Sequence, residues 1–374
     1  MTQQNKVTTA SSVTPQPAET ETERLPGLVP FGNAEVSTRH ADVYQDIQAD
    51  HVLRVRWNKN TWQFDAANHV ALQITCLSPG IVRFRYSHDG LFPADFSYAP
   101  DPDFLPDLPP ARLEENEKEY VLSTDEFQIV ILKEGMITKI LDTSGQPLQE
   151  DAGGFTARRT VLRGLCEVRM EKKCQKKEIF LGLGDKTCGT NLTGKQYDNW
   201  NTDAYAFGSG SSHLYRTVPF YYSLHQGIAC GIFFDNSYRS HFDFDSEKKG
   251  IVSFRAEGGE MNYYFLYGPS LEEVARRYAA LTGKMELPPL WALGFHQCRW
   301  SYYPDSRVRE VADTFRKLHI PCDALYLDID YMDAYRCFTW DEKHFPQPKT
   351  LVDDLQKQGF QTVVMIDPGI KEDP

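Results

Sequence analysis

The pattern of hydrophobic and polar positions along the chain changes near Pro269. From about Val52 to Glu260, short segments either alternate between apolar and polar residues or run apolar, and Gly, Asn and Ser separate them. Examples are HVALQITCL, IVRFRYS, FQIVIL, MITKIL and GIACGIFFDN. Helical periodicity is almost absent from this part, so the pattern predicts a β-sandwich.

After Pro269 the pattern becomes helical. In SLEEVARRYAALTG, Ser270 and Glu273 have the spacing of a capping box, and Gly283 is placed to end the helix. One apolar stripe is expected to face the protein interior. Its members are Leu271, Val274, Ala275, Tyr278 and Ala279.

The segments beyond Pro289 alternate between strand and helix patterns. In order they are WALGFHQC (strand), SRVREVADTFRKLHI (helix), CDALYLDI (strand), TLVDDLQKQG (helix, with Thr350 as its cap) and QTVVMID (strand). This order predicts parallel strands with right-handed crossovers, as in a doubly wound sheet or a (β/α)8 barrel. No Gly-rich phosphate loop follows the first strand, which argues against a nucleotide-binding sheet.

Polar groups follow all three of these strands. They are Gln297 and Arg299 after the first, Asp328 and Asp330 after the second, and Asp367 after the third. In a barrel the carboxyl ends of the strands form the working face. The long segment after Asp330 would then be a functional loop on that face.

Length and charge narrow the function classes. A chain of 374 residues is expected to form at least two domains. We predict a disordered polar tail over residues 1–24, the sandwich over 25–285 and the barrel part over 286–374. The net charge of -12 argues against nucleic acid or an anionic membrane as partner. It does not argue against a neutral sugar, whose binding does not depend on the net charge of the protein. No apolar run reaches the ~18 residues of a membrane span.

The cysteines and the first residues predict a location. The eight cysteines contain no CxxC and no paired zinc spacing, and several lie in apolar runs. The polar first residues lack the apolar segment of a signal peptide. Buried free thiols in a reducing, cytoplasmic environment are therefore expected.

Three interpretations compete for the acidic cluster at Asp328 and Asp330. The Asp-x-Asp pair could hold Mg²⁺ or Mn²⁺, although no nucleotide site accompanies it. The acids could be structural, capping the loop or pairing with Arg336 or Lys343. They could also bind sugar hydroxyls or stabilise a cationic transition state. Six aromatic residues in the adjoining loops favour the sugar interpretation: Trp300, Tyr302, Tyr303, Tyr331, Phe338 and Trp340.

Several motifs in the last hundred or so residues closely resemble the start of the catalytic barrel of glycoside hydrolase family 31, the α-glucosidase family. They are LPPLWALGFHQCRW, IPCDALYLDIDYMD, FTWD, FP and DPGI. The upstream segments GLGDKTCGTNLTGKQYDNWNTDAYAF, LYRTVPFYYS and GIFFDNSYRSHFDFD are similar to the family's N-terminal sandwich. The resemblance implies a galactose-mutarotase-like β-sandwich followed by the first three β/α units of a (β/α)8 TIM barrel.

The resemblance also implies roles for individual residues. Asp328 matches the aspartate that binds hydroxyls of the non-reducing glucose, and Ile329 matches the apolar residue beside it. Trp300 matches an aromatic residue that lines the glucose pocket. Ile366 and Asp367 match the end of the third strand, near the pocket. More loosely, Asp203 matches a sandwich loop that reaches into the site.

The implied activity is retaining hydrolysis of terminal α-linked glucose, with an α-glucoside oligosaccharide as substrate and with neither metal nor organic cofactor. Retaining glycosidases need two carboxylates ~5–5.5 Å apart. In the family both lie further along the barrel, the nucleophile in a DMNEP-like motif that this sequence does not contain. We therefore expect the nucleophile and the acid/base to lie beyond Pro374. The chain alone should be an inactive N-terminal portion, completed by further barrel units or by a second chain.

Two alternatives stay open at this point. One is a transglycosylase or lyase of the same family, since these share the sugar pocket. The other is a non-catalytic carbohydrate-binding or regulatory chain. The sequence does not determine the linkage preference or the oligomeric state.

Overall fold

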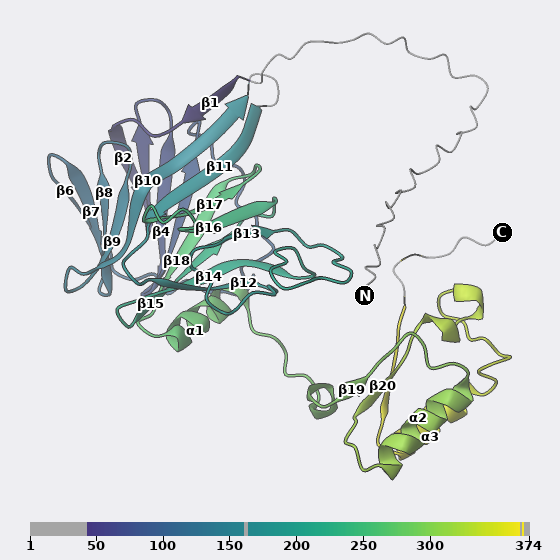
Figure 1. Ribbon diagram of the computed structural model, residues 1–374. Coiled ribbons are helices and arrows are strands. Elements are labelled where there is room, and N and C mark those ends of the chain that lie inside the picture. Colours follow the sequence, from purple (N-terminus) through teal and green to yellow (C-terminus); the bar gives the residue numbers. More distant parts are fainter. Residues whose placement is uncertain (1–42, 161–163, 367–368, 370–374) are drawn as a thin grey trace, which may run out of the picture.

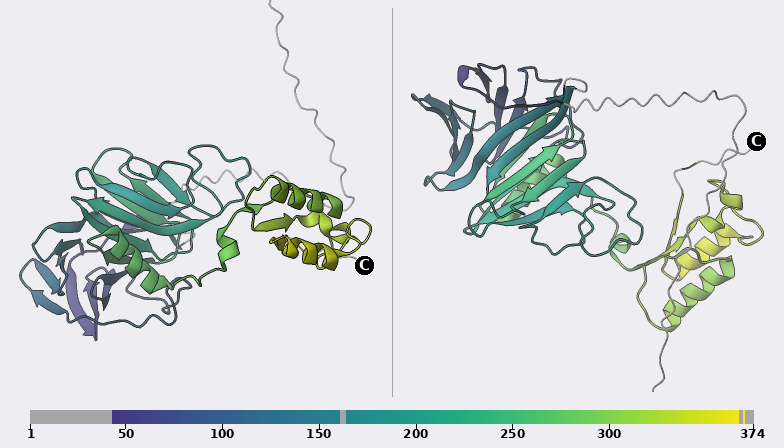
Figure 2. Two further views of the ribbon diagram at one scale, coloured as in Figure 1. Left: turned by 90° about the horizontal axis from the view of Figure 1, so that it is seen from below. Right: turned by 45° about the horizontal axis from the view of Figure 1, so that its top comes forward.

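The structure, a computed structural model, describes residues 43–160, 164–366 and 369. The tail predicted for residues 1–24 lies outside these residues. Two parts are visible in Figure 1: a large β-rich part, and a smaller part with helices α2 and α3. In the views of Figures 1 and 2 the smaller part stands beside the larger one, and one extended segment joins them.

The β-rich part consists of two antiparallel sheets, as the sequence predicts. In spatial order, the ten-stranded sheet contains β13 (Gln196–Asn199), β16 (Ser240–Phe244), β17 (Ile251–Ala256), β11 (Gly164–Lys173), β10 (Pro147–Thr160), β9 (Thr138–Asp142), β8 (Phe127–Leu132), β7 (Glu119–Ser123) and β6 (Arg112–Glu115), with β1 (Tyr44–Ile47) paired to β10. The eight-stranded sheet contains β12 (Ile179–Gly184), β14 (Thr217–His225), β15 (Ile228–Phe234), β18 (Met261–Tyr267), β5 (Ile81–Ser87), β4 (Ala71–Ser78), β3 (Thr61–Ala66) and β2 (Val52–Asn58).

The core of the sandwich lies between the two sheets and is rich in aromatic rings. Phe254 of β17 contacts Tyr263 of β18 across the interface, with ring centroids 5.5 Å apart. Phe180 of β12 stacks on Phe244 of β16 at 4.8 Å. All four side chains are almost completely buried. Burial of such large apolar groups is the main force that holds the two sheets together.

Helix α1 (Leu271–Thr282) packs on the outer face of the eight-stranded sheet, where Tyr278 stacks on Phe220 at 4.2 Å. Ser270 caps the helix by accepting a hydrogen bond from the backbone N–H of Glu273, and Gly283 ends it with a positive φ of 85°, as predicted. The predicted apolar stripe is wrong at Leu271, which is exposed. The side chain of Glu273 binds Arg276 and Arg277 of its own helix, so among the described contacts only the Ser270 half of the predicted capping box forms.

The smaller part contains a three-stranded parallel sheet, which confirms the predicted start of a barrel. Its strands are β19 (His296–Gln297), β20 (Ala324–Leu327) and β21 (Gln361–Val364), and its helices are α2 (Asp305–Lys317) and α3 (Pro348–Lys357). Leu327, Val308 and Leu351, from β20, α2 and α3, share one buried cluster. Three short 3-10 turns complete this part: η1 (Leu290–Leu293), η2 (Ile329–Tyr331) and η3 (Asp333–Tyr335).

Several predicted bounds in the smaller part are wrong. The first strand is predicted over WALGFHQC, but its beginning forms η1 and only two residues pair with β20. Thr350 does not cap α3, because the helix begins earlier, with Pro348 in its first turn. Leu318, which belongs to the predicted helix SRVREVADTFRKLHI, lies beyond the last helical residue of α2 and is exposed. The predicted division at residues 285 and 286 falls in the segment between α1 and η1, and it stays a prediction.

Candidate functional site

The candidate site is the edge of the three-stranded sheet where the parallel strands end. Strand β20 leads to it, and its residues Ala324, Leu325 and Leu327 are buried. The backbone of the next strand stays paired up to this edge, because the N–H of Met365 donates to the carbonyl of Leu327 at 2.9 Å. The packed strand thus fixes the position of the residue that follows it, Asp328.

Asp328 is half-buried at the start of η2 and caps that turn. Its Oδ1 accepts a hydrogen bond from the backbone N–H of Ile329 at 2.8 Å. Among the described residues no other hydrogen bond or ion pair reaches this carboxylate. One oxygen therefore holds the turn, while the other is open to accept hydrogen bonds from ligand hydroxyls.

The neighbouring acids have protein partners. Asp330 accepts a hydrogen bond from the hydroxyl of Tyr335 at 3.1 Å, and this contact raises the pKa of the tyrosine. Asp333 lies 3.4 Å from Nη1 of Arg336. Protein contacts therefore account for Asp330 and Asp333. Asp328 caps η2 with one oxygen and keeps the other without a partner among the described residues. No group of three or more His, Cys, Asp or Glu side chains in the described part of the chain could hold a metal ion.

The six aromatic residues predicted near the acids differ in how far they are exposed. Trp300 and Phe338 are 73% and 81% exposed, so their ring faces are accessible. Tyr302 and Tyr331 are instead buried in the core of the smaller part, so their ring faces are not accessible to a sugar. Tyr303 is 39% exposed, and Trp340 packs partly against the same core. The hydroxyl of Tyr331 donates to the carbonyl of Met365 at 3.1 Å and so ties η2 to the end of β21.

The remaining predicted residues are placed as follows. Ile329 packs partly against the core, and Ile366 is 47% exposed after β21. Asp367 lies outside the described residues. Asp203 is exposed in the loop between β13 and β14, where it interacts with Tyr215. Within the described residues, no hydrogen bond or ion pair joins Asp203 to the barrel edge, so its predicted approach to the site stays a prediction.

Two features near this edge were not predicted. Asp341 accepts hydrogen bonds from the hydroxyl of Tyr303 at 3.2 Å and from Nδ1 of His344 at 2.7 Å, and the histidine contact lowers its pKa. This cluster fastens the loop after η3; the i,i+3 spacing of Asp341 and His344 was the available signal. Cys298 is exposed and lies close to Asp328. The pKa of its thiol is raised, mainly because the sulfur is partly shielded from water and to a smaller extent because of the negative charge of Asp328.

The comparison with protein families covers both parts of the chain. Residues 71–243 match the glycosyl hydrolase 31 N-terminal galactose mutarotase-like domain. Residues 285–374 match the glycosyl hydrolases family 31 TIM-barrel domain.

Curated relatives include enzymes named as α-glucosidases. The chain is 40% identical over 270 residues to alpha-glucosidase 2 of Bacillus thermoamyloliquefaciens, covering 72% of this chain and 34% of that protein. It is 36% identical over 214 residues to an alpha-glucosidase of Saccharolobus solfataricus, covering 57% of this chain and 31% of that protein. The chain therefore spans about a third of the length of these relatives.

Solved structures with the same fold include a GH31 dextranase of Flavobacterium johnsoniae, one form of which is complexed with isomaltotriose. The TM-score is 0.77 at 32% identity, covering 85% of this chain and 38% of the dextranase. A glucosidase II alpha subunit superposes with a TM-score of 0.74 over 87% of this chain and 44% of that one. At 19% identity, this second likeness shows the fold alone.

Proposed function

Because the chain belongs to glycosyl hydrolase family 31, of which it spans the N-terminal part, we propose that it supplies the glucose-binding side of an α-glucosidase-type active site. The observation that carries this proposal is Asp328. Its carboxylate is fixed by a buried strand and one backbone hydrogen bond, and one oxygen has no partner among the described residues. A carboxylate with a free oxygen can accept charge-assisted hydrogen bonds from sugar hydroxyls.

The surroundings of Asp328 suit a pyranose ring. The exposed indole of Trp300 offers an apolar face, and Ile366 adds a smaller apolar surface after the next strand. Asp203 would reach this pocket from the sandwich loop, and Asp367 would continue the third strand toward it. Together these residues bind and orient the terminal glucose. We assign neither the nucleophile nor the acid/base to any of them.

The reaction we propose for the assembled enzyme is retaining hydrolysis of terminal α-linked glucose in an α-glucoside oligosaccharide. It uses two carboxylates ~5–5.5 Å apart and needs no metal or organic cofactor. Further β/α units would supply this pair and complete the barrel, either from the same polypeptide or from a second chain. The exposed apolar residues Val364, Met365 and Ile366 at the end of β21 support such a completion.

Hydrolysis of p-nitrophenyl α-glucoside tests this proposal. We expect no turnover by the 374 residues alone, and turnover after co-expression with the remaining barrel units. Asp328→Ala in the assembled enzyme should lower kcat/KM at least a hundredfold, since a charged hydrogen bond to the sugar contributes about 1.5–3 kcal/mol and orients the substrate as well. Asp330→Ala is the matched control, because Asp330 already binds Tyr335. Equal losses in both variants would contradict the assignment.

We also propose a cytoplasmic, reducing location. The support is that the seven cysteines whose side chains are described are all free, with Cys76, Cys230 and Cys322 buried. No helix in the described part of the chain is long and apolar enough to cross a membrane. Cell fractionation with an antibody against the chain tests the location directly, and recovery in a secreted fraction would contradict it.

A further inference from the structure

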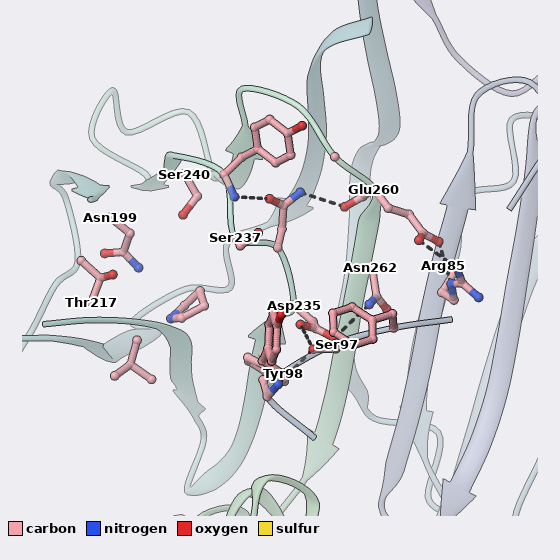
Figure 3. A pocket seen from close by; sticks show the side chains of 18 of the residues that line it. Arg85, Ser97, Tyr98, Asn199, Thr217, Asp235, Ser237, Ser240, Glu260 and Asn262 are labelled. Atoms are coloured by element: carbon pink, nitrogen blue, oxygen red, sulfur yellow. Dashed lines mark hydrogen bonds and ion pairs between the residues drawn. The ribbon is translucent and has the colours of Figure 1, made fainter. Parts of the chain in front are cut away.

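A cleft of about 760 Å³ opens on the sandwich, over the outer face of the eight-stranded sheet. Strands β5, β15 and β18 form its floor, and loops from three separate stretches of the chain, near residues 94–99, 199–201 and 235–238, form its walls (Figure 3). Its volume lies within the range of about 300–1,000 Å³ that is typical of small-molecule sites.

The charged side chains of the cleft are already neutralised by one another. Arg83 binds Asp95 through two hydrogen bonds of 2.8 Å. Arg85 binds Glu260 through hydrogen bonds of 2.6 and 2.9 Å (Figure 3). Both guanidinium groups are largely buried, so neither is available to an anionic ligand. The paired carboxylates are equally unsuited to a cation.

The remaining charged residue of the cleft, Asp235, also has hydrogen-bond partners within the protein. Its carboxylate accepts hydrogen bonds from the hydroxyl of Ser97 at 2.7 Å and from Nδ2 of Asn262 at 3.1 Å. Burial raises the pKa of this carboxyl group. The cleft therefore presents little net charge to a ligand.

The open polar groups of the cleft are neutral. Asn199 is 4% exposed, and its Nδ2 has no hydrogen-bond partner within the described residues. Its Oδ1 accepts from Nζ of Lys186 at 3.0 Å, and the same ammonium group donates to the carbonyl of Ser212 at 2.9 Å. Because an ammonium group only donates, the amide oxygen must face Lys186. The amide N–H groups are consequently held toward the interior of the cleft, as Figure 3 shows.

A second neutral group lies close by. Ser240 is 2% exposed and lines the same wall, and its hydroxyl takes part in none of the hydrogen bonds described for residues 43–160 and 164–366. A buried donor without a partner, such as Nδ2 of Asn199, destabilises the folded chain. Buried polar groups in native proteins nearly always have partners, so an unpaired amide facing a cleft indicates a site for a ligand or for ordered water.

Aromatic rings surround the entrance. Trp200 follows Asn199 directly and is 50% exposed, and Tyr98, from the loop near residues 94–99, is 95% exposed. Tyr238, which also lines the cleft, is half exposed. Exposed ring faces next to neutral hydrogen-bonding groups are suited to a molecule with both C–H faces and hydroxyl groups.

From this combination we propose that the cleft binds a neutral saccharide, with the Asn199 amide donating to a sugar hydroxyl and Trp200 packing against a ring face. The cleft is formed by sandwich residues alone, so binding requires neither Asp328 nor a completed barrel. Ligand hydroxyls supply the acceptor that the Asn199 amide lacks in the protein. Sugar C–H groups cover the exposed indole.

Calorimetric titration of the 374-residue chain with maltose and with isomaltose tests the proposal. We expect saturable binding of at least one of them. Asn199→Asp keeps the acceptor for Lys186 but replaces the inward donor with an oxygen, and it should weaken binding about tenfold. Trp200→Ala should weaken binding by a similar factor. The control is Trp57→Ala, since Trp57 is 75% exposed on β2 of the same sheet but lies outside the cleft, and its loss should leave affinity unchanged.

A further variant, Asp328→Ala, separates this cleft from the barrel edge. Binding that survives Asp328→Ala and is weakened by Asn199→Asp and Trp200→Ala supports the sandwich cleft. Binding that is lost with Asp328→Ala and unchanged by the other two would overturn the cleft proposal while supporting the function proposed above. The absence of binding of either sugar to the unmodified chain would also overturn the proposal.

Discussion

The sandwich and the barrel part bury their apolar residues to different extents. In the sandwich, two sheets enclose a continuous core, and α1 covers part of an outer face with a second cluster. In the barrel part, two helices and three short strands share a small core. Large apolar side chains outside that core stay exposed, including Leu290, Leu293, Phe295 and Ile366.

This difference indicates that the sandwich can bury its apolar surface by itself, whereas the barrel part needs further elements to do so. When two sheets pack face to face, each buries its apolar face against the other and needs no further partner for that face. A three-stranded parallel sheet needs neighbours at both edges and cover on both faces, which a closed barrel provides. The sandwich should therefore behave as a finished domain, and the barrel part should gain order from added β/α units.

The largest expected effect is on the buried ion pair of the sandwich. Nζ of Lys172 lies 2.6 Å from Oδ1 of Asp151, and both side chains are almost fully buried. Asp151→Ala would leave an unpaired ammonium group in the core and should lower the free energy of unfolding by about 3–5 kcal/mol. Urea denaturation followed by circular dichroism measures this loss.

The adjacent pair provides the control for that measurement. Lys173 and Glu150 also form an ion pair, but both side chains are partly exposed to solvent. Glu150→Ala should cost about 0–1 kcal/mol. Similar losses in both variants would show that the Lys172–Asp151 pair does not hold the sandwich core together.

The next effect should be confined to the barrel part. Leu351 of α3 is fully buried in its small core, and Leu351→Ala should cost about 2–5 kcal/mol. In a thermal melt we expect the transition of the barrel part to shift downward while that of the sandwich stays in place. Leu318→Ala serves as the matched variant, because this leucine is 59% exposed and its loss should cost less than about 0.5 kcal/mol. A common shift of both transitions would show that the two parts unfold as one.

A smaller effect tests whether α1 belongs to the sandwich. The guanidinium of Arg277 donates twice to Glu126 and once to the carbonyl of Tyr267, and its side chain is 14% exposed. Arg277→Ala should destabilise the sandwich by about 1.5–3 kcal/mol, measured by chemical denaturation. Arg276→Ala, one residue earlier and 66% exposed, should have an effect below about 1 kcal/mol. If the two variants cannot be distinguished, α1 is not anchored by Arg277.

The smallest effect is a pH dependence in the barrel part. The hydrogen bond from His344 lowers the pKa of Asp341 below its ordinary value of 3.8. The stabilisation is therefore complete above that ordinary value and is lost as the pH falls through the lower folded-state pKa. Asp341→Asn should remove this acid-dependent step from the melting temperature of the barrel part. Asp353→Asn, which changes only a surface ion pair, should retain it.

Most of the fold could be predicted because its signals are local. The period of apolar residues indicated the strands β4, β5, β8 and β9, and the change of period near Pro269 indicated α1 and the strand–helix alternation. The first and last residues of β19 and α3 were predicted less accurately. An apolar run does not distinguish a 3-10 turn from a strand, and pairing with β20 alone decides which residues extend.

The position of Asp328 could be predicted because an acid that follows a buried strand has a defined place, whereas its role in binding stays a prediction. Burial of the aromatic residues was not predictable. Tyr331 and Phe338 are both aromatic residues of one loop, yet the first packs inward and the second is exposed. The cleft around Asn199 was missed because its walls come from segments distant in sequence, which only the folded sandwich brings together.

Hydrogen exchange measured by mass spectrometry, with and without the remaining barrel units, tests the central claim most directly. Peptides from β15 and β18 should be equally and strongly protected in both samples. Peptides from β20 and β21 should exchange rapidly in the chain alone and become protected when the added units bind, and the segment containing Asp328 should become protected with them. Protection of β20 in the isolated chain as strong as that of β18, and unchanged on addition, would contradict the claim that the barrel part needs completion.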